Sequence, residues 1–539
     1  MSPPRVVRND WSSVSPPDLD AGWQPTTTVS VVIPAFRGQA ELDLVLAALS
    51  RQTWPSELLE VIVVDDGSDP PLRLPDVRPE HTTLLRVQDG WGKANALRTG
   101  VAASSGEILH LLDADMVVYP EHVAALARWP AVLPYAVVLG AKRFVDPAVH
   151  GPWPGPEQVV RAWEAGDAAG LFGGAAGEPH EYQERYIAQT DQLRTANHLA
   201  FRIVVGASLA LRRELYDAAG GPDPALRFGN DTEFGYRLAQ AGAVIIPEPR
   251  ARAWHLGPTH VMRQHDAVAR YRQAFLADRV PSPRHWRKVG GTTWTVPLVE
   301  VVTSVADQPL ERVRAAVDSV LRGTERDLRI SLVGPWDRIE RGRVPAFEDP
   351  LLEARLIAAT YRGEPRVRLV TQPPETSFPA PYRLELPAGH GLAPDAVRVL
   401  VDLADRYQAG VVRVSGSPGR PDTYLWRTSA LGRARWTRQP GESLVDAVTA
   451  IHGCREATAE EVGVVDLTSF DPSELTNGLP DHAAGRTRRG RLVPTTVEVE
   501  GVRSLARATV VVAWLGARRL RAGLTRLVRR RGRRVSARH

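Results

Sequence analysis

The chain has a single cysteine, Cys454, among its 539 residues. One thiol cannot form an intrachain disulfide, so the disulfide frameworks that staple small secreted domains are excluded. The N-terminus also lacks a basic start followed by an apolar core, and no signal peptide is therefore visible. Both absences lead us to expect a cytoplasmic protein in a reducing environment.

Long hydrophobic runs are missing as well. The apolar stretch ATVVVAWLGA near the C-terminus has only ten residues, whereas a helix needs about 20 to span a bilayer. We therefore do not expect a membrane-spanning helix in this stretch. A helix lying on a membrane surface is still compatible with such a short segment.

Positive charge is concentrated at the C-terminal end. Residues 486–539 hold sixteen arginines and two glutamates, while the whole chain has a formal net charge of +5, so the remainder is net acidic. Leu520, Leu524 and Leu527 recur at helical spacing among the arginines, which predicts a basic amphipathic helix. Peripheral association with an anionic membrane at the inner face of the cell membrane, docking on the acidic body and a solvated tail all remain open. No recognition motif accompanies the charge, so nucleic-acid binding is not expected.

Acidic residues follow two apolar runs in the first part of the chain. VSVVIPAF (29–36), a helical pattern and LEVIVVDDGSD (59–69) form a strand, helix, strand unit, which predicts a parallel sheet. A later run, EILHLL, ends in Asp113 and Asp115. Ligands bind at the carboxyl ends of parallel strands, and a carboxylate pair there suits a hard divalent cation. An isolated pair of this kind is most often a solvated turn, but its neighbours favour the metal site.

Four motifs in this order resemble the family 2 glycosyltransferases, which have the nucleotide-sugar-binding GT-A fold. They are VVIPAF, VIVVDDGSD, GWGKANALRTGVAASSGEILHLLDADM and GNDTEFGYRLAQAG, and they cover roughly residues 28–260. The resemblance implies a Rossmann-like, mostly parallel α/β sheet that binds a nucleotide-diphosphate sugar, here expected to be UDP-linked. It also implies a Mn²⁺ or Mg²⁺ ion and transfer of a hexosyl group to an acceptor hydroxyl with inversion.

Donor-binding residues follow from this resemblance. Pro34 and either Asp65 or Asp66 are expected to bind the uracil or ribose, although DDGSD is also good turn chemistry. Lys93 is expected to offer a point charge to the donor phosphates; an ordinary exposed lysine is the alternative. Asp113 completes the expected donor-binding group.

Metal ligands and the catalytic base are expected on three further segments. Asp113 and Asp115 would hold the ion directly or through water, and His255 could supply another ligand, with His260 and His265 as weaker candidates. A structural histidine is the alternative for each of these.

An inverting transfer needs a base for the acceptor proton. We expect Asp231 in this role, with Glu233 supporting it or contacting the acceptor. The family usually has Glu then Asp where this chain has Asn230 then Asp231, and simple helix capping remains an alternative.

The second half of the chain repeats the pattern of the first. Residues 299–336 mirror the strand, helix, strand pattern of residues 29–68, and a gapless match places Pro387 to Gly389 opposite Asp113 to Asp115. This predicts a degenerate GT-A-like domain that lacks the metal-binding aspartates; an unrelated α/β domain is the alternative. Glu442 falls near the position of Asp231, where a helix start explains it.

The expected domains follow from these patterns. They are an N-terminal arm (1–28), a catalytic GT-A domain (29–280), a linker (281–298), the degenerate GT-A-like domain (299–470) and a basic C-terminal tail with a helix (471–539). A Gly-rich insertion within 151–182 could form an acceptor-side lid.

Together these patterns predict a metal-dependent inverting glycosyltransferase. The expected acceptor is a cell-envelope glycan or a lipid-linked molecule. A noncatalytic glycan-binding or scaffold protein is one alternative, and a sugar-phosphate nucleotidyltransferase is a weaker one because VVIPAFRGQAEL lacks the expected Gly-rich loop.

Overall fold

The structure is a computed structural model, and it describes residues 3–172, 177–258, 264–287, 293–339, 345–416, 419–476 and 478–479. These residues belong to one compact unit. The basic tail with its expected amphipathic helix lies outside the described residues. Within the described part of the chain, no helix is both long enough and apolar enough to cross a membrane.

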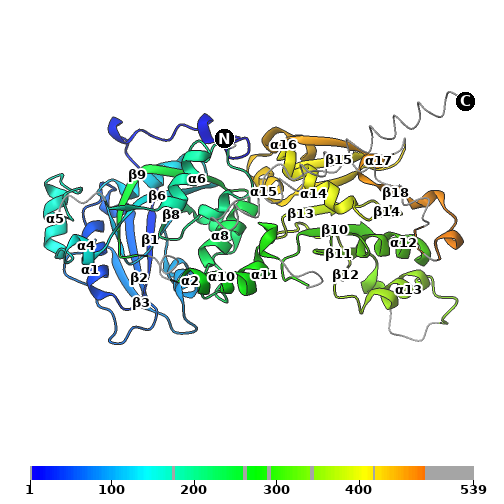
Figure 1. Cartoon of the computed structure of the whole chain (residues 1–539), viewed down its shortest axis with the longest axis horizontal. Helices are drawn as coiled ribbons and strands as arrows, with labels where there is room; N and C mark the ends of the chain where they lie inside the picture. Colours follow the sequence, from blue (N-terminus) through cyan, green and yellow to red (C-terminus); the bar gives the residue numbers. More distant parts are fainter. Residues whose placement is uncertain are drawn as a thin grey trace, which may run out of the picture. The chain divides into compact units, whose positions relative to one another are not determined.

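A nine-stranded sheet forms the core of the first half of the chain. Its strands run in the order β3-β2-β1-β4-β8-β6-β9-β5, with β7 paired to β6 (Figure 1). The bounds are β1 (Val29–Ala35), β2 (Leu59–Asp65), β3 (Thr82–Arg86), β4 (Ile108–Leu112), β5 (Met116–Val118), β6 (Ala136–Val145), β7 (Glu178–Pro179), β8 (Ser208–Arg212) and β9 (Val244–Leu256). β1 pairs in parallel with β2 and β4, and β8 is antiparallel to its neighbours β4 and β6. The carboxyl ends of β1, β2 and β4 therefore meet at one edge.

Helices cover both faces of this sheet. They are α1 (Gln39–Leu49), α2 (Lys93–Ala103), α3 (His122–Val132), α4 (Pro147–His150), α5 (Pro156–Glu164), α6 (Glu181–Gln189), α7 (Arg213–Ala219), α8 (Asn230–Gln240), α10 (His265–Tyr271) and α11 (Ala277–Arg279). Val31 and Ile33 of β1 pack in one apolar core with α1 and α3, whereas Val32 faces the opposite side. Because strands buried on both faces need apolar residues throughout, β1 is a nearly continuous apolar run.

α2 lies very close to the sheet. A Cβ atom at Gly100 would stand 2.4 Å from Cγ1 of Val32 and 2.9 Å from Cγ2 of Val64. Only glycine allows this approach, and the approach carries the start of α2, with Lys93, to the carboxyl edge of β1 and β2.

A second sheet repeats the first strand by strand. Its order is β12-β11-β10-β13-β16-β15-β17, with β14 paired to β18 beside it. The bounds are β10 (Val299–Ser304), β11 (Leu328–Val333), β12 (Val367–Val370), β13 (Tyr382–Glu385), β14 (His390–Leu392), β15 (Val411–Ser415), β16 (Thr423–Arg427), β17 (Cys454–Thr458) and β18 (Val464–Asp466). Its helices are α12 (Leu310–Leu321), α13 (Leu352–Tyr361), α14 (Ala396–Tyr407), α15 (Thr428–Thr437), α16 (Leu444–His452) and α17 (Ala459–Val462).

The parallel and antiparallel pairs of the two sheets also correspond. β10 is parallel to β11 and β13, and β16 is antiparallel to both of its neighbours, as in the first sheet. The predicted second α/β domain of GT-A type is thus confirmed. Glu442 lies just before α16, where its carboxylate binds Arg5 and accepts a hydrogen bond from the Gln439 amide, so this residue anchors a loop.

A buried arginine joins the two halves. Arg433 of α15 is 3% exposed, and its guanidinium donates to the carbonyls of Gly242 and Ala243 at 2.7 Å each, and to those of Val6 and Arg8. A Cβ at Gly242 would stand 2.3 Å from the Arg433 amide nitrogen, so the two backbones nearly touch. One side chain therefore satisfies carbonyls from the first domain and from the N-terminal arm.

Replacing this arginine with an apolar residue of similar length should destabilise the protein. We expect Arg433→Met to lower the free energy of unfolding by about 3 kcal/mol or more, because buried carbonyls lose their donors. Urea denaturation followed by tryptophan fluorescence would measure the change. Arg435→Met, at an exposed position of the same helix, is the control and should leave the midpoint in place; equal midpoints for both variants would contradict this role.

Two histidines are buried in the first domain, one on the sheet and one on a helix that covers it. The imidazoles of His110 on β4 and His122 on α3 stack with centroids 5.3 Å apart, and both contact the hydroxyl of Ser208, at 3.0 and 2.8 Å. His122 Nδ1 also lies 2.8 Å from the carbonyl oxygen of Arg252. Burial lowers the pKa of His122 to about 4, so this ring is neutral in the folded protein at neutral pH.

This pair predicts acid sensitivity with a definite sign. An unfolded histidine has a pKa of about 6.5, so as the pH falls from about 6.5 towards 4 the unfolded chain binds protons that folded His122 does not, and stability is lost. The contribution of His122 should reach about 3 kcal/mol. His122→Gln should flatten the pH dependence of the urea midpoint in this window, whereas His81→Gln, at an exposed position, should not. A parallel pH profile for both variants would refute the assignment.

Candidate active site

The carboxyl edge of the first sheet gathers the polar residues that the sequence singled out. Asp113 follows β4 directly, and its amide donates to the carbonyl of Ala207 at 2.9 Å, which ties it to the start of β8. The first turns of α2 and α8 bring Lys93 and Asp231 to the same place. Residues far apart in the sequence thus share one small site.

Lys93 lies at the centre of this site. Its Nζ is 2.5 Å from Oδ1 of Asp113 and donates to the carbonyl of Gly206 at 3.2 Å. A Cβ at Gly206 would lie 3.2 Å from both Lys93 Nζ and Cβ of Asp231, so this glycine leaves room for both side chains. Burial acts to lower the pKa of Lys93, but the carboxylates of Asp113 and Asp231 outweigh it and the pKa is raised. The lysine is therefore held as a cation.

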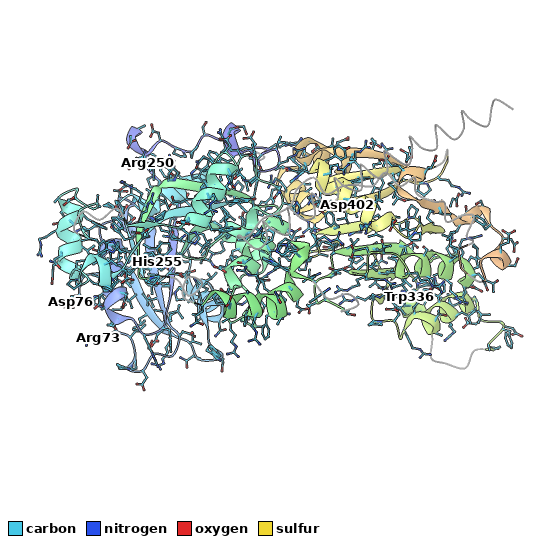
Figure 2. All side chains as sticks on the ribbon, in the orientation of Figure 1. Arg73, Asp76, Arg250, His255, Trp336 and Asp402 are labelled. Carbon is cyan, nitrogen blue, oxygen red and sulfur yellow. The ribbon has the colours of Figure 1, made fainter. Side chains whose placement is uncertain are left out.

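Asp115 and His255 are brought together by strand register. β5 pairs with β9 so that Met116 faces His255, which lies within the first domain (Figure 2). Nε2 of His255 lies 3.9 Å from Oδ1 of Asp115. Oδ1 of Asp115 and Nδ1 of His255 are buried without a hydrogen-bond partner. Burial raises the pKa of Asp115, His255 opposes the shift, and Asp113 adds to it. The pair therefore has unused ligand atoms.

These residues fit a divalent cation that takes few ligands from the protein. Among the residues that the structure describes, no three or more His, Cys, Asp or Glu side chains converge as a metal-binding group. Mg²⁺ sites of nucleotide enzymes typically use one or two carboxylates together with substrate phosphates and water. The unpartnered oxygen of Asp115, beside Asp113 and His255, suits that arrangement. His260 lies outside the described residues.

Asp231 faces the site from the start of α8. Its Oδ1 accepts a hydrogen bond from the Thr232 amide at 2.7 Å, and its Oδ2 one from the Gly206 amide at 3.5 Å. The long second bond leaves Oδ2 able to accept a closer donor. This geometry is compatible with a general base, and also with the capping role that the sequence left open.

Glu233 lies two residues after Asp231 on α8, in a different environment. It is 3% exposed, its Oε1 is 2.5 Å from Nε of Arg237, and its Oε2 accepts hydrogen bonds from Arg237 and from the Asp223 amide. Burial raises the pKa of Glu233, and Arg237 opposes the shift. Both oxygens are occupied within the protein, which favours a supporting role over contact with an acceptor.

The two aspartates after β2 have different partners. Asp65 is 2% exposed and accepts hydrogen bonds from the amides of Ser68 and Leu72 and from Arg86, so it holds its own loop. Asp66 accepts from the amide of Gly92 with both oxygens and is only half-buried, and burial raises its pKa. Asp66 is therefore the more accessible of the two expected donor ligands.

Pro34 lies on β1, paired with Val64, one residue short of the Ala35–Asp65 pair that ends the ladder. It is half-buried beside this loop.

Lys142 belongs to the same site, and sequence reasoning missed it. Its Nζ donates to Oε1 of Gln183 on α6 at 2.8 Å, and burial lowers its pKa to about 8 while Asp113 and Asp231 oppose the shift. A lysine within the apolar strand β6 was the available signal. Gln183 lies on α6, one residue beyond the expected lid region, whereas α5, which lies within that region, packs on α1.

The strand order, the antiparallel β8 and the carboxylates after β4 together define a GT-A-type nucleotide-sugar-binding domain. Residues 30–214 match the family described as glycosyl transferase family 2. Over these residues the match agrees with the family resemblance that the motifs indicated.

Several known proteins are similar to this chain. It is 25% identical to a chondroitin synthase of Escherichia coli over 366 residues, which is 64% of this chain and 50% of that protein. It is 30% identical to a validoxylamine A glucosyltransferase of Streptomyces hygroscopicus subsp. limoneus over 249 residues, 44% of this chain and 53% of that protein. The chain thus spans about half the length of these curated relatives.

Among solved structures, the mannosyltransferase PcManGT from Pyrobaculum calidifontis, in complex with GDP-Man and Mn²⁺, is 22% identical. The match covers 49% of this chain and 65% of that one with a TM-score of 0.31.

Proposed function

We propose that the first domain is a metal-dependent inverting glycosyltransferase that moves a sugar from a nucleotide-diphosphate sugar to an acceptor hydroxyl. The observation that carries the proposal is the cluster of Asp113, Asp115 and Asp231 with Lys93 and Lys142 at one sheet edge. Three carboxylates and two cations suit a reaction in which a proton leaves one substrate and a diphosphate leaves the other.

Each side chain has a proposed task. Asp66, with Asp65 and Pro34 supporting its loop, would bind the nucleoside. Asp113, Asp115 and His255 would hold Mn²⁺ or Mg²⁺, which when bound supplies positive charge for the diphosphate leaving group.

Lys93 now neutralises Asp113 and is close enough to shift to a donor phosphate once a cation takes over that carboxylate. Asp231 would accept the proton of the attacking hydroxyl, and the Glu233–Arg237 pair would fix the helix that carries Asp231.

The partners are proposed from chemistry and similarity. A UDP-linked donor fits an aspartate that accepts a hydrogen bond from a uracil imide. A glycan acceptor is favoured by the relative named as a chondroitin synthase. A lipid-linked or cell-envelope acceptor is proposed from the basic C-terminal tail. We place the protein in the cytoplasm, with the basic tail as a means of peripheral contact with an anionic membrane. A noncatalytic glycan-binding protein would have no need of the lysine-neutralised carboxylates.

Donor turnover tests the metal site. With Mn²⁺ and a panel of nucleotide sugars, the full chain should release nucleoside diphosphate, and Asp115→Asn should reduce that release by about a hundredfold or more, because a cation stabilises the leaving group by several kcal/mol. Asp76→Asn, which lies at the margin of the first domain in Figure 2, should be unaffected. If no nucleotide sugar raises the melting temperature in the presence of Mn²⁺, the transferase proposal fails.

Asp231 can be tested separately from donor binding. Asp231→Asn should keep the affinity for the donor, measured by calorimetry with Mn²⁺, while turnover falls by about 10² to 10⁴, the usual contribution of a general base. Asp217→Asn, an exposed aspartate on α7, should behave as the wild type. Unchanged turnover in Asp231→Asn would remove this residue from the mechanism, and a parallel loss of donor affinity would assign it to binding.

A further inference from the structure

As far as the structure describes it, the second sheet lacks a helix on the face that α2 covers in the first. In the first domain α2 lies between β3 and β4 and packs on β1 and β2. Residues 371–381, between β12 and β13, are all described and contain neither helix nor strand. The face that α2 covers in the first copy is therefore left to an irregular segment in the second.

The residues on this face have changed in character. Strand pairing makes Val299 the equivalent of Val29 and Leu328 that of Leu59. It follows that Ile62, which faces α2, corresponds to Ser331, while Glu60 corresponds to Arg329. The next strand carries Arg368, which pairs with Ser331. Of the three residues on which α2 packs most closely, Val32 and Val64 keep their apolar character as Val302 and Val333, and only Ile62 has become polar, as Ser331.

A pocket of about 170 Å³ lies on this surface. Its floor includes Glu300, Arg329, Ser331 and Arg368 of the three strands, and its wall includes Thr376 and Ser377 of the irregular segment. A single water molecule needs about 10–15 Å³ of such space. The pocket is therefore large enough for a sugar-sized ligand and much larger than an ion requires.

The charge within the pocket is only partly balanced. Oε1 of Glu300 accepts a hydrogen bond from Ser331 at 2.7 Å, and its Oε2 lies 3.8 Å from Nη1 of Arg329, beyond hydrogen-bond distance. Arg329 donates through Nη2 to the carbonyl of Thr295 at 2.8 Å. Arg368 is exposed and has no ion pair among the described residues. The pocket is thus lined by two guanidinium groups and one carboxylate.

Two further observations indicate a built site. The hydroxyl of Ser377 is buried without a hydrogen-bond partner, in a residue that is 4% exposed. The segment that carries Ser377 is held by Arg383, which donates from Nη1 to the carbonyl of Pro374 at 2.6 Å. Burial lowers the pKa of Arg329, and nearby Arg368 adds to the shift. A bound anion would reduce the repulsion between these two positive charges.

We propose that this pocket binds an anionic saccharide unit, with its acid group facing Arg329 and Arg368 and its hydroxyls reaching the serine and threonine side chains. Guanidinium groups bind carboxylates and phosphates with matched geometry, so a uronic acid and a sugar phosphate share the required chemistry. The inference goes beyond the transferase reaction and does not depend on it. It assigns glycan binding to the copy of the fold that lacks the metal-binding aspartates.

Calorimetric titration of the full chain with glucuronate, glucose 6-phosphate and glucose tests the proposal. At least one of the two acids should bind, and glucose should bind about tenfold more weakly or not at all. The acid that binds more tightly identifies the acid group. If neither acid binds better than glucose, the proposal is overturned.

Variants show whether the binding belongs to this pocket. Arg368→Ala should weaken binding of the preferred acid by about tenfold or more, whereas Arg362→Ala, an exposed arginine just after α13, should not. Equal affinities for Arg368→Ala and the wild type overturn the proposal. Inorganic phosphate that binds as tightly as glucose 6-phosphate, with no binding of glucuronate, would reduce the site to a simple anion site and overturn the saccharide assignment. Because binding is measured, loss of donor turnover would not affect the outcome.

Discussion

The neutralisation of clustered carboxylates is the constraint on which the first domain depends. Parallel strands deliver Asp113 and Asp115 to one sheet edge, and α8 adds Asp231 to the same place. Such a cluster would repel itself in a partly buried site unless cations compensated for it. Lys93 and Lys142 supply that compensation from α2 and β6, and each makes a close contact that fixes its position. The site is thus held together by contacts within the protein.

The second domain shows how the same scaffold behaves without this constraint. Its strands keep the order and directions of the first sheet, because those are set by apolar packing and backbone pairing. Because Pro387 and Gly389 stand where the first domain has Asp113 and Asp115, these two positions bring no charge that has to be balanced at that edge. The counterpart of α2, which brings the compensating lysine, is also absent from the described segment. On the face that α2 covers in the first domain, the second has arginines where the first has Glu60 and Thr83, and a serine where it has Ile62.

Hydrogen bonds between buried polar groups join the two domains. Carbonyls near Gly242 and in the N-terminal arm would be left unsatisfied by a purely apolar contact, and the guanidinium of Arg433 satisfies them together. The backbones at Gly242 and Arg433 lie so close together that no water molecule fits between them to donate a hydrogen bond to these carbonyls. The arm, which is polar and rich in proline, is therefore ordered by hydrogen bonds more than by a core of its own; Asn9, for example, donates to the carbonyls of Leu193 and Ile245.

The sequence by itself determined the fold of both domains and the place of the carboxylates. Strand, helix and turn patterns are local, and the match of Asp113 to Pro387 required only an alignment of one half of the chain with the other. The tertiary structure decided which side chains are available. Asp65 looked as suitable as Asp66, and Glu233 could have either supported Asp231 or contacted the acceptor, but the oxygens of Asp65 and Glu233 are taken by partners that packing supplies. The role of Arg433 and the pocket beside Arg368 were likewise out of reach, since each depends on contacts between distant segments. Lys142 had a local signal, a lysine within an apolar strand, but its place near Asp113 and Asp231 also depends on segments that are distant in the sequence.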